Sequence, residues 1–573
     1  MAVEPPLPFD SQWNAPTNSG QFLNQIEEVF EYHELSKHQF YRSAPGPGYL
    51  DWANQPNPFR RYQGAKEVPL KLVSEDLGPD YEGVLSRTAT TAQPPTFDAV
   101  SQLFQDSLGL SAWKSFQDSA WALRVNPSSG NLHPTEGYLI CGPVKDLTDS
   151  PIVAHYAPKE HVLEVRAHFS NSLWKEITRD LPENSFFVAL TSIYWREAWK
   201  YGERAFRYFH HDVGHAIGAV TMAAAVLGWR TRLLSHIGTK ELQSMLGLRN
   251  QSGPDREHPD CCISIFPQNS EPPNALRESQ SLFELFDALE WHGIPNELSP
   301  EHVNWQWVEK MSELTQRPFE KQKLEQLKYD ERTIIVRDVD PPIRKMIHQR
   351  RSAVAFDGVG SMSAINFYSL LEKTLPARGR VPFEVFDWEP KVNFLIFVHR
   401  VEGLKPGLYF FFRNLSHLPY FKENSRPEFS WSKPDGCPDS LPLFALISGD
   451  AREAAKAMSC TQDIASDGCF SLGMITQFEQ PIRENGPWFY PRLFWESGLV
   501  GQVLYLDAEV IGTRSTGIGC FFDDPVHDIL GLKNRGFQSL YHFTVGHPVE
   551  DARLITLPPY SEELLSRRGY GRG

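Results

Sequence analysis

Two stretches of the chain, Gly214–Leu248 (GHAIGAVTMAAAVLGWRTRLLSHIGTKELQSMLGL) and Gly498–Leu532 (GLVGQVLYLDAEVIGTRSTGIGCFFDDPVHDILGL), align with each other without a gap. The closing Leu-Gly-Leu coincides, and so do the pairs Gly214/Gly498, Ala224/Ala508, Gly228/Gly512 and Arg230/Arg514. Such self-similarity indicates an internal duplication, and two copies of one domain can pack together as the subunits of a symmetric dimer do. We therefore expect a tandem duplication that forms a pseudo-dimer.

Length, composition and charge narrow the class of protein. A chain of 573 residues exceeds what one hydrophobic core normally supports, and 41% hydrophobic with 22% charged residues is typical of a globular protein. A net charge of −15 argues against nucleic acid or an anionic membrane as partner. The seven cysteines include the adjacent pair Cys261-Cys262 and fit a reducing compartment. We expect a cytoplasmic protein without a membrane span.

The pattern along the chain predicts an α+β fold. We expect an N-terminal arm over residues 1–80, a first domain over 81–270, a connector over 271–335 and a second domain over 336–573. Strands mix with long helices without regular alternation, which favours sheets flanked by helices. The expected strands lie at 138–141, 152–156, 186–190 and 263–266 in the first domain, and, in the same order, at 394–398, 407–412, 443–447 and 540–545 in the second. Expected helices include 21–35, 97–108 and 363–371.

Three polar motifs are candidates for ligand binding. The stretch 124–136 (RVNPSSGNLHPTE) has small residues that let a flat ligand approach the backbone, although a capped turn would have the same composition. Arg350-Arg351-Ser352 suits a phosphate, although a solvated basic face is the common alternative. Thr516–Cys520 (TGIGC), expected as a loop between helices, could hydrogen-bond the edge of a ring. It lacks the strand and helix context of a dinucleotide fingerprint.

Taken together, these motifs resemble the FMN-dependent nitroreductase superfamily, and within it the SagB-type or thiazole/oxazole (azoline) dehydrogenase branch. The resemblance spans most of the chain and rests on YHELSKH (32–38), YLDWANQPNPFRRY (49–62), NPSSGNLHPTEGYL (126–139), WKYGERAFRYFHHDVGH (199–215), RRS (350–352) and GIGCFFDD with the following LGL (517–532). It implies two tandem nitroreductase-like domains, each a mixed sheet flanked by helices, with FMN bound between them.

The resemblance also implies roles for individual residues. Phosphate would contact Arg350, Arg351, Ser352 and Arg553, and the flavin ring would contact Ile518, Gly519 and Cys520 from the second copy and Pro127, Ser128, Ser129 and Asn131 from the first. Lys200 and Tyr201 match the catalytic pair of azoline dehydrogenases. Lysine acts as a base only where its surroundings lower its pKa; a lysine with an exposed amine beside a packed tyrosine is the equally compatible structural alternative.

The second, reciprocal site is expected to be degenerate. The first copy offers only Arg87-Thr88 in place of RRS and 235–237 (SHI) in place of the glycine loop. The second copy has no PSSxN motif before its strand at Phe394, and it carries Glu484-Asn485 at the position of the Lys-Tyr pair. We therefore expect one FMN for each chain, in a pseudo-dimeric monomer.

Other polar side chains are weaker candidates. His211 and His215 are spaced like a zinc pair, but no third ligand is evident, and we expect no metal. Cys460 and Cys520 are expected to be small packed residues, because neither has a flanking cationic motif.

The expected function is hydride transfer to or from flavin N5, with a small-molecule or peptide-borne substrate and NAD(P)H or oxygen as a second substrate. A nitro- or quinone reductase that uses nicotinamide is an alternative within the same class. A non-catalytic duplicated protein that docks peptide substrates or enzymes in a biosynthetic complex is the alternative from another class.

Overall fold

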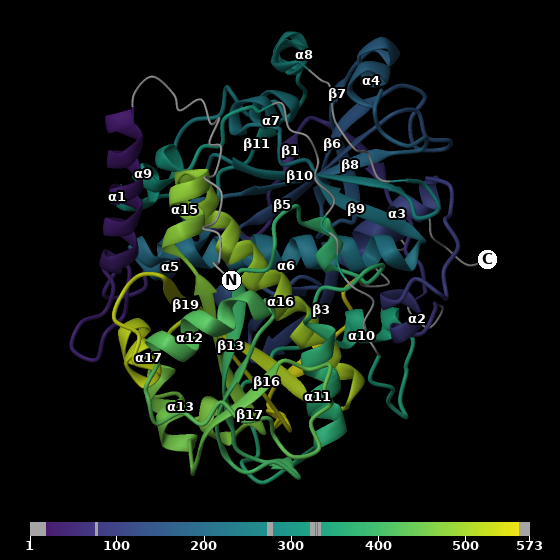
Figure 1. The fold of residues 1–573 in the computed structure, drawn as a ribbon. Helices are drawn as coiled ribbons and strands as arrows, with labels where there is room; N and C mark the ends of the chain where they lie inside the picture. Colours follow the sequence, from purple (N-terminus) through teal and green to yellow (C-terminus); the bar gives the residue numbers. More distant parts are fainter. Residues whose placement is uncertain are drawn as a thin grey trace, which may run out of the picture.

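Two long helices form the centre of the molecule. The computed structural model describes residues 19–74, 78–271, 279–320, 327, 329 and 334–560. Helices α6 (Ala205–Val226) and α16 (Tyr490–Val510) contain the first parts of the two aligned stretches, and every residue of both is buried. Figure 1 shows the main sheet of the first half above α6 and the strands of the second half below it. Both helices are therefore covered on all sides, as expected of a helix that is apolar all round.

The two helices contact each other through equivalent positions. A Cβ added to Gly214 would lie 2.9 Å from Gly498 Cα, and one added to Gly498 would lie 3.0 Å from Gly214 Cα. The backbone of Trp495 also lies against Gly214, and the backbone of His211 lies against Gly498. Residues 211 and 495 are themselves equivalent in the alignment, so the contact is reciprocal, as across the two-fold axis of a dimer. Any side chain at either glycine would push the helices apart.

The first half contains a seven-stranded antiparallel sheet. Its spatial order is β2 (Lys66–Pro69), β7 (Val162–His168), β6 (Ile152–Ala157), β5 (Thr135–Cys141), β8 (Phe186–Ser192), β10 (His258–Pro267) and β9 (Trp229–Leu233).

The second half contains a six-stranded antiparallel sheet with a matching order. Its strands are β16 (Leu443–Ser448), β15 (Gly407–Phe411), β13 (Val392–Val398), β17 (Phe470–Gln477), β19 (Phe537–Gly546) and β18 (Arg514–Ile518). Strand by strand this corresponds to the first sheet without β2. The expected α+β class, with sheets flanked by helices, is confirmed.

Two details of the sequence prediction are wrong. The order of expected strands pairs 443–447 with 186–190, but the sheets pair β16 with β7 and β17 with β8. Neither β7 nor β17 was expected, because β7 carries Glu164 and Arg166 and β17 carries Gly473, which weaken a strand pattern. The TGIGC stretch is also no loop between helices: its first three residues end the edge strand β18.

The helices flanking the sheets include the expected α1 (Ser19–Leu35), α3 (Phe97–Ser107) and α11 (Ala364–Lys373). Thr96 and Ser363 cap α3 and α11 by accepting hydrogen bonds from the backbone N–H three residues on. The other helices are α2 (Tyr81–Leu85), α4 (Asn171–Ile177), α5 (Tyr194–Tyr201), α7 (Thr239–Met245), α8 (Gln280–Glu284), α9 (Gln306–Leu314), α10 (Ile343–Gln349), α12 (Leu418–Asn424), α13 (Arg452–Met458), α14 (Ile464–Asp467), α15 (Glu479–Asn485) and α17 (Asp523–Leu530).

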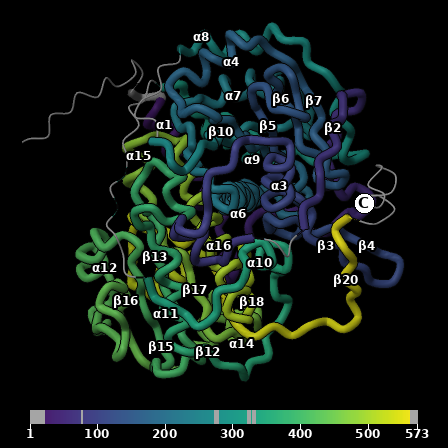
Figure 2. The backbone as a smooth tube through the Cα atoms, turned by 90° about the vertical axis from the view of Figure 1, so that its right-hand side faces the viewer, coloured from purple at the N-terminus to yellow at the C-terminus, as the bar shows by residue number. Residues whose placement is uncertain are grey.

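Segments from the ends of the chain tie the halves together. Helix α1, purple in Figure 1, lies beside α9, with Lys310 Nζ 3.1 Å from Glu28 Oε1. A short strand, β1 (Tyr62–Gln63), pairs with β11 (Ile294–Pro295). After the second sheet, β20 (Ile555–Leu557) pairs with the hairpin of β3 (Leu110–Phe116) and β4 (Ser119–Arg124), beside which Figure 2 shows it in yellow. Within the described residues, no helix is long and apolar enough to cross a bilayer.

Candidate functional site

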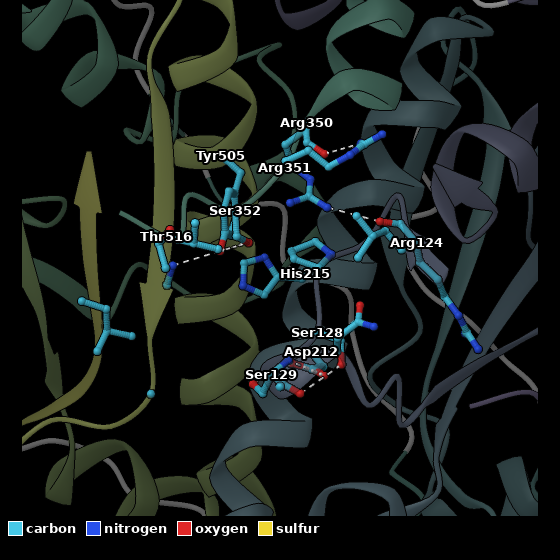
Figure 3. Close-up of a pocket in the computed structure, with 18 of the residues that line it drawn as sticks. Arg124, Ser128, Ser129, Asp212, His215, Arg350, Arg351, Ser352, Tyr505 and Thr516 are labelled. Atoms are coloured by element: carbon cyan, nitrogen blue, oxygen red, sulfur yellow. Dashed lines mark hydrogen bonds between the residues drawn. The ribbon is translucent and has the colours of Figure 1, made fainter. Parts of the chain in front are cut away.

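A cavity of about 470 Å³ lies between the two halves. One wall comes from β4, the 127–131 loop and α6; the other comes from residues 350–352, the end of β18 and residues 549–554. Figure 3 shows Ser128, Ser129 and Asp212 across from Arg350 and Ser352. The cavity brings together eleven of the residues singled out from sequence: Pro127, Ser128, Ser129, Asn131, Tyr201, Arg350, Arg351, Ser352, Ile518, Gly519 and Cys520.

Two of the expected residues do not line the cavity. Lys200 lies behind the 127–131 loop, where a Cβ added to Gly130 would be 3.0 Å from its Nζ. Gly130 has a φ of +59°, so its lack of a side chain permits both the turn and this close approach. The side chain of Arg553 is 75% exposed, and its Nη2 donates to Asp551 Oδ2 at 2.7 Å. Lys114 and Arg514 line the cavity instead.

Arg350 brings a buried positive charge to one end of the cavity. Its Nη2 donates to the carbonyl oxygens of Arg124 and Val125 at 3.2 and 3.3 Å. Its Nε has no hydrogen-bond partner, and no carboxylate of the described residues lies within ion-pair distance of the guanidinium. A buried cation without a counter-ion is costly, so this end of the cavity favours an anionic ligand.

Three more cations lie near Arg350. Arg351 Nη2 donates to Ser111 O at 3.0 Å, and Lys114 Nζ donates to Thr556 Oγ1 at 2.7 Å. Burial and the neighbouring Arg351 lower the pKa of Lys114. Arg514 Nη1 lies 2.5 Å from Glu550 Oε1. Arg514 also lies 3.6 Å from Glu509 Oε1. Four cationic side chains in one region still exceed what Glu509 and Glu550 neutralise, and guanidinium groups bind phosphate well.

The wall formed by residues 350–352 and the end of β18 is held in shape by Tyr505 and Arg204. The Tyr505 hydroxyl accepts from Gly517 N at 2.9 Å and lies 2.9 Å from Ser352 Oγ. Arg204 Nη2 donates to Gly519 O at 3.0 Å, while its Nη1 donates to the buried Asp523 at the start of α17. A side chain at residue 519 would run into the ring of Tyr208. Gly519 therefore lets the backbone pack directly against the ring of Tyr208, while residues 517–519 line the cavity.

Several polar atoms of the 127–131 loop are hydrogen-bonded to other parts of the protein. Ser129 N and Oγ donate to Asp212 Oδ1 at 3.0 and 3.1 Å. His133 N donates to Ser128 Oγ at 2.8 Å, and Asn131 Nδ2 donates to Ala122 O at 2.9 Å. These hydrogen bonds fix the loop against α6 and the β3–β4 hairpin. Ser128, Ser129 and Asn131 also line the cavity, and their contact with a flavin ring stays a prediction.

A pair of buried acids lies beside this loop. Asp212 lines the cavity, and burial raises its pKa to about 7 despite the hydrogen bonds from Ser128 and Ser129. Glu197 on α5 is fully buried beside Asp212. Burial and the neighbouring Asp212 raise the pKa of Glu197 far above its usual range, which favours its protonated, neutral form. The pKa of Asp212 lies near neutral pH, as that of a proton-transfer group often does.

Two of the three histidines of α6, His211 and His215, are neutral and packed. His211 stacks on the ring of Tyr541, with centroids 4.1 Å apart. His215 lines the cavity, and burial together with Arg350 lowers its pKa to about 3. Its Nε2 lies 3.2 Å from the Tyr541 hydroxyl, and its Nδ1 has no partner. Over the part of the chain that the structure describes, no group of three or more His, Cys, Asp or Glu side chains is arranged to hold a metal ion.

Sequence reasoning missed several residues of the site. Asp212 lies between the two histidines that drew attention as a zinc pair, and Glu197 lies three residues before Lys200. A buried helix that carries an acid is a signal that could have found both. Lys114 and Arg514 gave no signal of ligand binding, because only the fold brings β3 and β18 to the same cavity. The expectation of packed cysteines is wrong for Cys520, which is exposed at the rim.

The equivalent region on the other side of the two central helices is nearly filled. A cavity of about 90 Å³ lies there, lined by Ser235 and Ile237 among others. The guanidinium of Arg492 stacks 4.2 Å from the ring of Trp488, and both side chains line this cavity. Arg87, the counterpart expected for the RRS motif, forms an ion pair with Glu384. The two halves thus provide one open and one occluded cavity.

Comparisons with known proteins agree with this fold. The sequence model of the nitroreductase family matches residues 90–265. A candidate nitroreductase from Anabaena variabilis superposes with a TM-score of 0.66 at 21% identity, over 91% of this chain and 99% of its own. The chain therefore has a nitroreductase-like fold.

Two further solved structures match less of the chain. A candidate nitroreductase from Ralstonia eutropha (14% identity, TM-score 0.27) covers 40% of this chain and 98% of its own. The E. coli microcin synthetase McbBCD complex with truncated pro-MccB17 (16% identity, TM-score 0.27) covers 35% of this chain and 70% of the matched chain. No curated protein shows a significant match.

Proposed function

We propose that this protein is an FMN-dependent oxidoreductase of the SagB-type dehydrogenase class, with one composite site for each chain. The observation that carries the proposal is the open cavity between the halves, which joins the cationic end at Arg350 to the backbone at Gly519 and the 127–131 loop. The nitroreductase match over residues 90–265 supports the choice of FMN. When bound, FMN supplies two-electron hydride chemistry at N5.

The residues present fit FMN. Arg350, Arg351, Lys114 and Arg514 would hold the phosphate, and the unpaired Nε of Arg350 gives one N–H donor for it. Gly519 and the 127–131 loop would flank the ring, because neither wall has a side chain that closes the gap between them. His215, neutral and with an unpaired Nδ1, is a further polar contact.

The substrate side of the proposal rests on Lys200, Tyr201 and the two acids. Tyr201 lines the cavity. Its hydroxyl packs closely against Gly130, since a Cβ added to that glycine would lie 2.5 Å from the hydroxyl oxygen. We propose Lys200 as the base that removes a carbon-bound proton from an azoline-like, small-molecule or peptide-borne substrate; this role requires its Nζ, which lies behind the 127–131 loop, to reach the cavity when substrate binds. Tyr201 would position that substrate, and Asp212 would hold or release a proton near neutral pH.

The proposal includes the tandem duplication. The matching strand orders and the reciprocal contact between Gly214 and Gly498 support two copies of one ancestral domain that pack as a pseudo-dimer. One copy would supply the phosphate contacts and the other the 127–131 loop. The occluded second cavity is consistent with loss of the reciprocal site.

An absorption spectrum tests the proposal. The purified protein, with FMN added and the excess removed, should retain a flavin spectrum that NAD(P)H or a reduced substrate bleaches without oxygen. A protein that stays colourless after FMN addition would refute the proposal. Bound flavin that no donor reduces would favour the non-catalytic docking protein. Lys200→Ala should retain the flavin spectrum and lose turnover with an azoline substrate.

A further inference from the structure

Two cysteines from distant parts of the second half meet at the rim of the cavity. Cys460 follows α13, and Cys520 follows β18, 60 residues later in the chain. Their sulfur atoms lie 2.7 Å apart, within about 1 Å of the S–S distance of a disulfide. Neither cysteine belongs to a CxxC motif, so only the fold brings them together.

The two cysteine-bearing segments are tied to each other by hydrogen bonds. Gln462 Nε2 donates to Ser459 O at 2.8 Å and to Cys520 O at 3.1 Å. The backbone N–H of Phe522 donates to Met458 O at 2.8 Å. These bonds bracket both cysteines, so the short distance between the sulfurs is set by the backbone and not by two freely rotating side chains.

Access and charge distinguish this pair from the other cysteines. Of the seven cysteines, five are buried, Cys460 is partly buried and Cys520 is exposed and lines the cavity. The hydrogen bond with Cys460 and the positive charge of Arg204 lower the pKa of Cys520 to about 7. The attacking species in thiol–disulfide exchange is the thiolate, which a lowered pKa makes abundant near neutral pH.

We propose that Cys460 and Cys520 form a redox-active dithiol that reacts with small disulfide compounds to give an intramolecular disulfide. The Cys520 thiolate attacks one sulfur of the external disulfide, breaks its S–S bond and releases one thiolate. Cys460 loses its proton to solvent, attacks Cys520 Sγ in the mixed disulfide and displaces the second thiolate. The two cysteines lose two electrons and two protons, and the external disulfide becomes two thiols.

The reaction is independent of the proposed flavin chemistry, because it requires only the two thiols and an external disulfide. It also has a consequence for the cavity. Cys520 is part of the wall next to Gly519, so a covalent bond to Cys460 fixes this wall to the segment after α13.

Mass spectrometry of the full-length protein without added flavin tests the proposal. The protein is first reduced, then treated with glutathione disulfide, unfolded in denaturant so that the buried thiols can react, alkylated and weighed. We expect two of the seven thiols to escape alkylation, a cross-linked peptide pair that contains Cys460 and Cys520, and no retained glutathione. A stable glutathione adduct on Cys520, or seven alkylated thiols, would overturn the proposal.

Single substitutions assign the two roles. Cys460→Ser should retain one glutathione on Cys520, because the resolving thiol is missing. In Cys520→Ser the attacking thiol is missing, so all six remaining thiols should stay reduced and become alkylated. Cys437→Ser is the matched control, since Cys437 is buried outside the cavity lining, and it should still form the cross-link. If Cys460→Ser resolves its adduct as the wild type does, Cys460 is not the resolving thiol and the proposal fails.

Discussion

Arg350→Gln should weaken FMN binding without unfolding the protein. The guanidinium is buried. Its Nη2 donates to two backbone carbonyl oxygens, and its Nε, at the cavity, has no hydrogen-bond partner. A hydrogen bond to a charged group contributes about 1.5–3 kcal/mol, so losing it should raise the Kd for FMN by roughly 10- to 150-fold. Quenching of flavin fluorescence during titration of the apo-protein measures the Kd directly.

Arg87→Gln is the matched control for this prediction. Arg87 occupies the corresponding place in the first half but is neutralised by Glu384, and the cavity on that side is nearly filled. Its loss should leave the Kd for FMN within about twofold of the wild type. The reasoning is refuted if Arg350→Gln also stays within about twofold while circular dichroism shows a folded protein, or if both variants lose affinity equally.

Four other changes test separate parts of the site and the fold. The pH profile of turnover should show an ionisation near the Asp212 pKa of about 7, and Asp212→Asn should abolish it. Lys200→Ala should lower kcat by roughly 10²–10⁴-fold with little change in FMN affinity, as expected for loss of a general base; an unchanged kcat would exclude that role. Gly130→Ala should displace Tyr201, because the added Cβ would lie 2.5 Å from its hydroxyl, and should cost about 1–2 kcal/mol of stability from the left-handed backbone. Burial alone would lower the pKa of His155, but hydrogen bonds to two buried glutamates raise it from 6.5 to about 9. Its contribution of about 3 kcal/mol to unfolding free energy is therefore complete below pH 6.5 and lost as pH rises through about 9. Denaturation of His155→Gln at pH 6 and pH 10 should show a smaller pH dependence than the wild type.

The fold was predictable where the sequence repeats itself. The alignment paired Gly214 with Gly498 and predicted a pseudo-dimer, and the central helices touch at these two glycines, because a close backbone contact tolerates only glycine on both sides. It could not anticipate β17, since Gly473 interrupts the strand pattern there and the cross-strand partner lies far away in sequence. At β17, pairing with β13 and β19 outweighs the weak local preference of the sequence for a strand.

The site was predictable in outline and not in its charges. Motifs placed Ser128 and Arg350 on facing walls, because each motif is local and only their meeting depends on the fold. The proton chemistry escaped prediction, because the pKa of Asp212 depends on how deeply the fold buries it and on the neighbouring Glu197. The contact between Cys460 and Cys520 likewise arises from two hydrogen-bonded turns that no spacing rule describes.

The amount of FMN bound per chain is the most direct test of a single composite site. The apo-protein is saturated with FMN, freed of excess by gel filtration, denatured, and measured for released flavin and for protein. One open cavity and one occluded cavity predict a ratio of one FMN per chain. A ratio of two would mean that the occluded side also binds, and a ratio of zero would mean that the cavity between the halves is not a flavin site.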